Sequence, residues 1–227
     1  MVTVISLGGS LVAPEGVDEA FLKDFTALIG ESLRHDEKRR FILVCGGGGP
    51  ARIWQRAYRN ISGGGVDEQA DRIGVMATRL NAQLVKAIMG EWCLQDVVID
   101  PTQAEPITGR VLVAAGWKPG FSSDYDAVLL AERFQAGTVI NLSNIEQVYT
   151  DDPRKNPDAK PVGAISWADF RALVGDEWTP GKNVPFDPVA SRRAADRGLK
   201  VIFAGGKNRE NLRKLLSGEP FLGTVIG

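Results

Sequence analysis

The sequence has too little histidine and cysteine for several common kinds of active site. It holds one His and two Cys in 227 residues. His35 lies in a charged run far from any motif, so neither a His-based catalytic triad nor a metal site with several His or Cys ligands can be assembled. Cys45 and Cys93 are too few for a disulfide framework and are typical of a cytoplasmic protein. Catalysis would rest on Lys, Arg, Asp, backbone amides and Mg²⁺.

Long apolar runs and a strong net charge are also missing. No run approaches the ~18 apolar residues that a membrane span needs, and the formal net charge is −1. We therefore expect neither a membrane nor a nucleic-acid partner. The apolar N-terminus has no charged region and runs straight into Gly8, so it is predicted to be a first strand and not a signal peptide.

What the sequence does contain is an alternation of short apolar runs and amphipathic segments. The apolar runs predict strands near residues 2–7, 40–45, 95–99, 111–115, 138–142, 199–204 and 222–226. The helical periodicity predicts helices over residues 18–34, 69–89, 124–135, 187–197 and 208–216. Such an alternation indicates a largely parallel sheet with helices on both sides.

Local signals add detail to these elements. The expected helix starts are Asp18, Asp124, Asp187 and Asn208. The expected apolar stripe of the helix 69–89 is Ile73, Met76, Leu80, Leu84 and Ile88. The proline-rich stretch 150–186 is interpreted as a mobile or substrate-side loop region.

Ligands bind at the carboxyl ends of the strands in such a sheet, so the loops there are the candidate site. Residues 8–10 read Gly-Gly-Ser, whose amides and hydroxyl suit an anion, although a tight turn explains them equally well. The second strand ends in four glycines, 46–49, followed by Pro50 and Arg52. This run favours phosphate binding at a helix start, with Arg52 in the first turn as an added donor.

Two later loops carry weaker signals. Residues 116–124 offer Lys118, the hydroxyls of Ser122 and Ser123 and a helix start. They suit a second anion such as a phosphoryl acceptor, although a helix cap beside a solvated Lys118 explains them equally well. The loop 143–153 sets an aromatic ring near two carboxylates, which suits a purine or a metal–phosphate, while a polar turn explains most of it.

Two glycine patterns imitate other nucleotide motifs. The run 46–51 matches the dinucleotide fingerprint, but the acidic residues about 20 positions on, Asp67 and Asp71, precede a helix with no strand before them. A dehydrogenase is therefore only a third hypothesis. The run 205–207 lacks the upstream glycine and the Ser/Thr of a Walker A motif and is interpreted as a strand–helix turn.

Taken in order, the motifs resemble the amino-acid-kinase superfamily, and within it the archaeal type of uridylate (UMP) kinase. The matching runs are 7–10, 44–52, 71–74, 78–82, 118–124, 148–153, 156–160, 186–188 and the ending 223–224. The resemblance extends essentially from residue 2 to residue 226. The glycine loops alone are not specific, whereas the order of the runs is.

The resemblance implies a fold, an activity and an assembly. The fold would be a single domain over 1–227, an α/β three-layer αβα sandwich with a mainly parallel central sheet. Its N-terminal half, about 1–137, would hold the acceptor, and its C-terminal half, about 138–227, would hold ATP. The activity would be ATP-dependent transfer to UMP, giving UDP in pyrimidine nucleotide biosynthesis, with Mg²⁺ held mainly by the phosphates. The assembly would be a cytoplasmic homo-oligomer, typically a hexamer.

Carried over by position, the resemblance also assigns residues to the two nucleotides. The ATP-binding residues would be Gly8, Gly9, Ser10, Gly48, Arg52, Ser143, Asn144, Tyr149 and Asp152. The UMP-binding residues would be Gly47, Asp71, Trp117, Lys118, Pro119, Gly120, Phe121, Ser122 and Ser123. The candidate catalytic residues are Arg52 and Lys118.

Two lysines of the family are replaced in this sequence. Gly49 stands where the glycine loop usually carries Lys, and Ser6 stands where many relatives have Lys in the first strand. Such a Lys would stabilise the transferring phosphoryl group, so Lys118 or Lys182 is expected to supply that charge. The same replacement motivates two alternatives: a kinase for another small phosphate or carboxylate acceptor, and a non-catalytic nucleotide or oxyanion binder.

Overall fold

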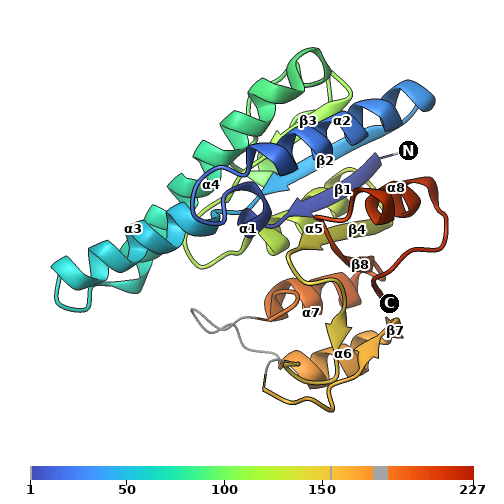
Figure 1. The fold of residues 1–227 in the computed structure, drawn as a ribbon. Coiled ribbons are helices and arrows are strands. Elements are labelled where there is room, and N and C mark those ends of the chain that lie inside the picture. The colour runs from blue at the N-terminus through green and yellow to red at the C-terminus, as the bar shows by residue number, and fades with distance from the viewer. Residues whose placement is uncertain (1, 154, 176–183) are drawn as a thin grey trace.

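A seven-stranded sheet forms the middle layer of the computed structural model, with helices on both of its faces (Figure 1). The structure describes residues 2–153, 155–175 and 184–227. The strand order is β3-β2-β1-β4-β8-β9-β7. These strands are β1 (Val2–Leu7), β2 (Arg40–Cys45), β3 (Val111–Ala114), β4 (Thr138–Ser143), β7 (Ala164–Ile165), β8 (Lys200–Gly205) and β9 (Thr224–Ile226). A separate two-stranded sheet pairs β5 (Val148–Tyr149) with β6 (Pro161–Val162).

Strands β3, β2, β1, β4 and β8 run parallel, and their pairing brings their carboxyl ends into one row. Leu7 at the end of β1 pairs with Cys45 of β2 and with Leu142 of β4. Strand β3 continues the row beyond β2, and β8 continues it beyond β4. Strand β9 is antiparallel to its neighbour β8, and β7 pairs parallel with β9, so these two strands run opposite to the other five. The predicted α/β fold with a mainly parallel sheet is thus confirmed.

The helices divide into two layers because successive strand residues point to opposite faces. The helices are α1 (Gly9–Val12), α2 (Glu19–His35), α3 (Gly48–Ile61), α4 (Asp67–Met89), α5 (Ser123–Arg133), α6 (Trp167–Val174), α7 (Pro188–Asp196) and α8 (Arg209–Ser217), with short 3₁₀ turns η1 (Gly90–Trp92) and η2 (Pro101–Gln103). Ile5 and Leu7 pack with the buried side chains of α2, α4 and α8. Val4 packs with those of α5, α6 and α7 on the other face. Burial on both faces explains the continuously apolar strands.

Three of the four predicted helix starts are confirmed. Asp18, Asp187 and Asn208 each cap a helix by accepting a hydrogen bond from a backbone N–H three residues on. The prediction for Asp124 is wrong, because Ser122 caps α5 and its side chain accepts from Tyr125 N. Asp124 therefore lies inside the first turn, where its carboxylate is free for other partners.

The predicted apolar stripe of the helix 69–89 is largely not the side of α4 that packs against the protein. Met76, Leu80 and Ile88 are 60%, 69% and 44% exposed. The side of α4 that packs inward instead carries the small and polar residues Ala77, Thr78, Asn81 and Ala82, followed by Val85 and Met89 near the end of the helix. The helix lies beside glycine-rich backbone, where there is little room for large side chains. This leaves a row of large apolar side chains on the outer surface.

Other predictions failed where the chain is irregular. Residues 95–99 do not form a strand, because only Val98 forms an isolated parallel bridge, to Ala114. In the stretch interpreted as loop, the described residues include β6, β7 and α6. The helix expected to start at Pro50 begins at Gly48 and continues to Ile61, and it projects with the first half of α4 beyond the sheet (Figure 1).

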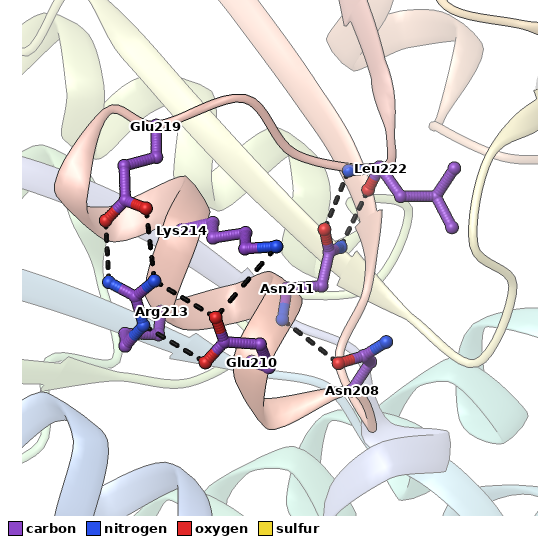
Figure 2. Close-up of polar contacts among 7 residues, drawn as sticks. All are labelled: Asn208, Glu210, Asn211, Arg213, Lys214, Glu219 and Leu222. Atoms are coloured by element: carbon purple, nitrogen blue, oxygen red, sulfur yellow. Dashed lines mark hydrogen bonds and ion pairs between the residues drawn. The ribbon is translucent and has the colours of Figure 1, made fainter.

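The C-terminal segment is fastened to α8 by a polar network (Figure 2). The Asn211 side chain donates to Leu222 O and accepts from Leu222 N, both at 2.7 Å. Arg213 joins Glu210 and Glu219 across the end of the helix. These contacts fix the approach to β9, where Thr224 Oγ1 accepts from Val148 N at 2.9 Å. The loop after β4 thereby rests on the C-terminal strand.

No helix within the described ranges is long and apolar enough to cross a membrane.

Candidate functional site

The predicted loops lie in one row along the carboxyl edge of the sheet. The loop after β1, residues 8–10, lies between the glycine loop 46–49 after β2 and the loop that begins at Ser143 after β4, because β1 pairs with both strands. The loop after β3 lies on the far side of the glycine loop, and the loop after β8 lies beyond Ser143. The sheet therefore brings together the loops predicted to bind two different ligands, with residues 8–10 in the centre.

The first two loops meet backbone to backbone, and this contact requires glycine. A Cβ on Gly9 would lie 2.1 Å from Gly48 N and 2.6 Å from Gly46 C, and a Cβ on Gly46 would lie 2.5 Å from Gly9 N. The buried Asn81 of α4 steadies the arrangement, because its Nδ2 donates to Gly46 O at 2.8 Å and to Gly47 O at 3.2 Å. The result is one surface of closely spaced peptide groups, the kind that receives phosphate oxygens.

Arg52 adds a cation to this surface. Its side chain is exposed on α3, where its Nη1 donates to Ser10 Oγ at 3.4 Å and its Nη2 to Pro14 O at 3.0 Å. Because α3 begins at Gly48, Arg52 lies one turn into the helix and not in the first turn as predicted. The guanidinium still lies beside residues 8–10, within reach of a ligand on the glycine surface.

The two positions that lack the family's lysines have specific surroundings. A Cβ on Gly49 would lie 2.3 Å from Pro14 O, so the chain has no room for a side chain there. Ser6 is buried, and its Oγ donates to Asp124 Oδ1 at 2.8 Å. Lys182, one of the two lysines expected to substitute, lies outside the described residues.

The remaining residues predicted for ATP come from the segment after β4. Ser143 ends that strand, and its carbonyl accepts from Gly206 N at 2.8 Å. Asn144 follows it, Tyr149 belongs to β5, and the carbonyl of Asp152 accepts from Asn156 N at 2.8 Å. The strand order puts Ser143 on the side of β1 opposite to the glycine loop. A nucleotide whose phosphates lie on residues 8–10 could extend toward this segment.

The loop after β3, residues 115–122 (the β3–α5 loop), is held mainly by side chains of two helices. From α4, Arg79 Nη2 donates to Trp117 O at 3.0 Å, and the Asp71 carboxylate accepts from Gly120 N at 3.1 Å. From α5, the Asp126 carboxylate accepts from Trp117 N at 3.0 Å. These contacts fix the loop next to the glycine loop, which agrees with a second ligand site there.

Aromatic rings line this loop. The centroids of Trp117 and Phe121 are 5.1 Å apart, and those of Phe121 and Tyr125 are 5.0 Å apart. The Lys118 ammonium lies 3.8 Å from the centroid of the Trp117 ring and 5.2 Å from that of Phe121. Lys118 is exposed, so the ammonium stays available to an anion while the rings restrain it. Pro119, Ser122 and Ser123 complete the predicted set within the loop and the first residue of α5.

Sequence reasoning missed several residues that hold these loops. Arg79, Asn81 and Asp126 bind loop backbone as described above, and Thr78 Oγ1 accepts from Gly116 N at 2.8 Å. Thr78 and Asn81 lie three residues apart on the inward side of α4. The run 78–82, one of those that carry the family resemblance, contains Thr78, Arg79 and Asn81, but nothing in it shows which backbone groups these side chains bind.

Carboxylates beneath the β3–α5 loop have raised pKa values. Burial, and then the neighbouring charge of Asp187, raises the pKa of Asp124 to about 6 against the hydrogen bond from Ser6. Burial, and then the charges of Asp124 and Asp100, raises the pKa of Asp126 to about 7 against the bond from Trp117 N. Burial also raises the pKa of Asp187. Asp126 is fully buried, so its ionised form is the one that folding disfavours.

The raised pKa of Asp126 predicts that the folded state loses stability as the pH rises. The group binds its proton more tightly in the folded than in the unfolded chain, so its contribution is complete below the unfolded pKa and is lost as the pH passes through about 7. The free energy of unfolding should decrease by on the order of 3 kcal/mol from this group between about pH 5 and pH 8. Asp126→Asn should flatten that decrease in urea titrations. Equal pH dependence in both proteins would contradict the prediction.

Comparison with known proteins matches nearly the whole chain. The amino acid kinase family matches residues 1–205. A uridylate kinase from Methanospirillum hungatei is 33% identical over 227 residues, which cover 98% of this chain and 93% of the relative. One from Methanothermobacter thermautotrophicus is 34% identical over 98% of this chain and 97% of its own.

Solved structures resemble the fold over its full length. The crystal structure of uridylate kinase from Archaeoglobus fulgidus has a TM-score of 0.85 and 30% sequence identity, and the match covers 100% of both chains. A UMP kinase from Bacillus anthracis has a TM-score of 0.77 at 20% identity, which bears on the fold alone. The sequence motifs, the sheet topology and the similar proteins therefore all indicate the amino acid kinase family.

Proposed function

The chain belongs to the amino acid kinase family, and we propose that it transfers the γ-phosphoryl group of ATP to UMP, giving ADP and UDP. The observation that carries this proposal is the extent of the similarity to proteins named uridylate kinase, which spans nearly all of this chain and of theirs. The same activity would serve pyrimidine nucleotide biosynthesis. The two buried free thiols, Cys45 and Cys93, fit a reducing cytoplasmic compartment.

The chemistry suits a site without histidine. An oxygen of the UMP phosphate attacks the γ-phosphorus of ATP, and the bond to the bridging oxygen breaks so that ADP leaves with the electron pair. The attacking oxygen is already anionic, so no general base has to remove a proton. Positioning of the two phosphates and neutralisation of their charge supply most of the acceleration. Backbone amides, Arg52 and Lys118 are groups of the required kind.

Each half of the domain would hold one nucleotide. We assign the ATP phosphates to residues 8–10 and Gly48 with Arg52 beside them, and the adenosine to the segment after β4. UMP would lie against Gly47, Asp71 and the β3–α5 loop. The strand order supports the proposed division at about residue 137, because the loop after β1 lies between the two groups of loops. Arg52 contacts Ser10, so the guanidinium is near the point where the two phosphates would meet.

Magnesium would be held mainly by the nucleotide phosphates. Within the described ranges, no group of three or more His, Cys, Asp or Glu side chains could hold a metal ion. Mg²⁺ keeps several waters and commonly binds proteins through few carboxylates plus substrate phosphates. When bound there, the ion would neutralise the charge on the transferring phosphoryl group.

A panel of acceptors tests the proposal. ADP release from ATP and Mg²⁺ should be fastest with UMP when CMP, AMP, small phosphates and acylamino acids are compared at equal concentration. Turnover of a non-nucleotide acceptor alone would contradict UMP as the substrate and leave a kinase of another specificity.

The blocked position at Gly49 and the serine at position 6 favour one competing function, a nucleotide or oxyanion binder. Tight ATP binding without turnover of any acceptor would select it.

Exposed apolar side chains on the projecting part of α3 and α4 support self-association of the protein. Large apolar side chains are exposed on α3, on α4 and at the residue before α4: Ile53, Trp54, Ile61, Val66, Met76 and Leu80. Apolar surface of this extent is typical of a protein–protein interface. We infer that the protein is a homo-oligomer, with the hexamer as the assembly implied by the family resemblance. Sedimentation velocity of the intact protein should give a mass above that of one chain, and a monomer would contradict the inference.

A further inference from the structure

Trp117 is the residue of the β3–α5 loop whose backbone N–H and carbonyl are both bound by side chains of neighbouring helices. Its backbone is bound on both sides, with the N–H donating to Asp126 Oδ2 and the carbonyl accepting from Arg79 Nη2, each at 3.0 Å. Its ring in turn packs with Phe121 and carries the ammonium of Lys118. A shift of the Trp117 backbone would therefore move the aromatic wall and the cation of the loop together.

The carboxylate that holds this backbone, that of Asp126, is buried at a cost in folding free energy. Asp126 has no exposed surface, and its neighbours in α5, Ala127 and Val128, are buried apolar residues. Among the described residues its Oδ1 has no hydrogen-bond partner, so half of the carboxylate is buried without compensation. Burying such a group destabilises a fold, and an apolar side chain would suit the same helix face. A role outside the packing of the core would explain why an acidic residue stands there.

We propose that Asp126 is a positioning residue for the acceptor: its buried carboxylate holds the Trp117 backbone from beneath, and thereby sets the wall of Trp117, Lys118 and Phe121 against which the acceptor nucleotide lies. The identity of that wall as the acceptor side rests on the proposed function. The contact itself does not, because it is a property of the fold. Asp126 touches neither nucleotide and acts only through the loop.

The contact should respond to pH. The charges of Asp124, on the same helix, and of Asp100, before η2, disfavour ionisation of Asp126. From α4, the Arg79 guanidinium binds Trp117 O and the Asp71 carboxylate binds Gly120 N, and within the loop the charge of Lys118 acts on Asp100. A neutral carboxyl group accepts a hydrogen bond more weakly than a carboxylate. The hold on Trp117 is therefore strongest above the pKa of Asp126 and weakens below it.

Fluorine NMR of the full chain tests the contact without reference to activity. The protein has five Trp, and in protein labelled with 5-fluorotryptophan the resonance of Trp117 can be assigned by its absence from Trp117→Phe. We expect this resonance to shift with a midpoint near pH 7, in line with the pKa of about 7 for Asp126. The shift near that pH should be absent in Asp126→Asn. The same titration in both proteins, or no titration in the wild type, would overturn the proposal.

Kinetics test the consequence for the acceptor. Asp126→Asn keeps an oxygen that can accept from Trp117 N, so the KM for UMP should stay within about twofold and lose its pH dependence near neutrality. Asp126→Leu removes the acceptor and should raise the KM for UMP about fivefold or more, while the KM for ATP changes less than about twofold. An unchanged KM for UMP in a folded Asp126→Leu protein would overturn the positioning role.

The NMR and kinetic experiments together distinguish a failure of this inference from a failure of the proposed function. If the wild type does not phosphorylate UMP, the proposed function fails, and the resonance of Trp117 still decides whether Asp126 holds the loop. If Asp126→Leu does not fold, the comparison of wild type with Asp126→Asn decides by itself, through both the resonance and the pH dependence of the KM for UMP. A purely structural role would change stability in these variants and leave the KM for UMP without pH dependence near neutrality.

Discussion

Gly9→Ala should lower kcat/KM for phosphoryl transfer about 100-fold, the size of loss that follows when reacting groups are misplaced by ~1 Å. The added Cβ would lie 2.1 Å from Gly48 N and 2.7 Å from Gly47 N. Atoms at this distance overlap, and both neighbours are backbone, which cannot rotate away. The loops after β1 and β2 would have to separate, and the phosphate-binding surface that they form together would open. Overpacking of this kind also costs about 1–3 kcal/mol of stability.

Gly16→Ala is the matched control for that experiment. Gly16 lies in the segment that follows α1, no atom outside its chain neighbours lies within 4 Å of its ideal Cβ, and its φ is outside the left-handed region. The control should keep both the free energy of unfolding and kcat/KM close to the wild-type values. Measurement of both quantities for each variant separates a local effect on the site from a general loss of folded protein. Wild-type kcat/KM in Gly9→Ala would contradict the contact between the two loops.

The central strands were predictable because short, continuously apolar runs are compatible with few structures other than buried strands. The residues of β2 and β8 are almost continuously apolar, and a strand buried on both faces explains that pattern. The row of loops at the carboxyl edge then followed from parallel topology, which is why residues 8–10 and 46–49 could be assigned to a site. Where pairing was marginal, as at Val98, the sequence alone could not distinguish one bridge from a strand.

The contacts that hold the site were not predictable, because they join residues far apart in the chain. Asn81 binds the glycine loop and Arg79 binds Trp117, and no local pattern identifies such partners. The same contacts explain the error in α4. Its inward side had to supply hydrogen bonds to loop backbone, so the large side chains such as Leu80 turned outward. Periodicity identified the helix and could not tell which side packs against the protein.

The sequence identifies the replaced lysines, whereas only the structure shows why a lysine would not fit at position 49. The backbone of Pro14 occupies the space that a side chain at position 49 would need, with 2.3 Å between the ideal Cβ and Pro14 O. A lysine placed there would displace the segment that also accepts a hydrogen bond from Arg52. Without a lysine at position 49, the guanidinium of Arg52 still brings a positive charge beside the glycine surface.

Arg52→Ala should therefore lower kcat/KM at least about tenfold, or ~1.4 kcal/mol in transition-state free energy. The guanidinium contacts Ser10 Oγ and Pro14 O and lies at the edge of the glycine surface, where charge would develop on the transferring phosphoryl group. The loss should appear mainly in kcat if the guanidinium binds the transition state more tightly than ATP, and mainly in KM for ATP if it binds both equally. Arg56→Ala, one turn further along the exposed surface of α3, is the control and should keep wild-type kinetics. An unchanged kcat/KM in Arg52→Ala would exclude Arg52 from the site and leave Lys118 as the cation to test.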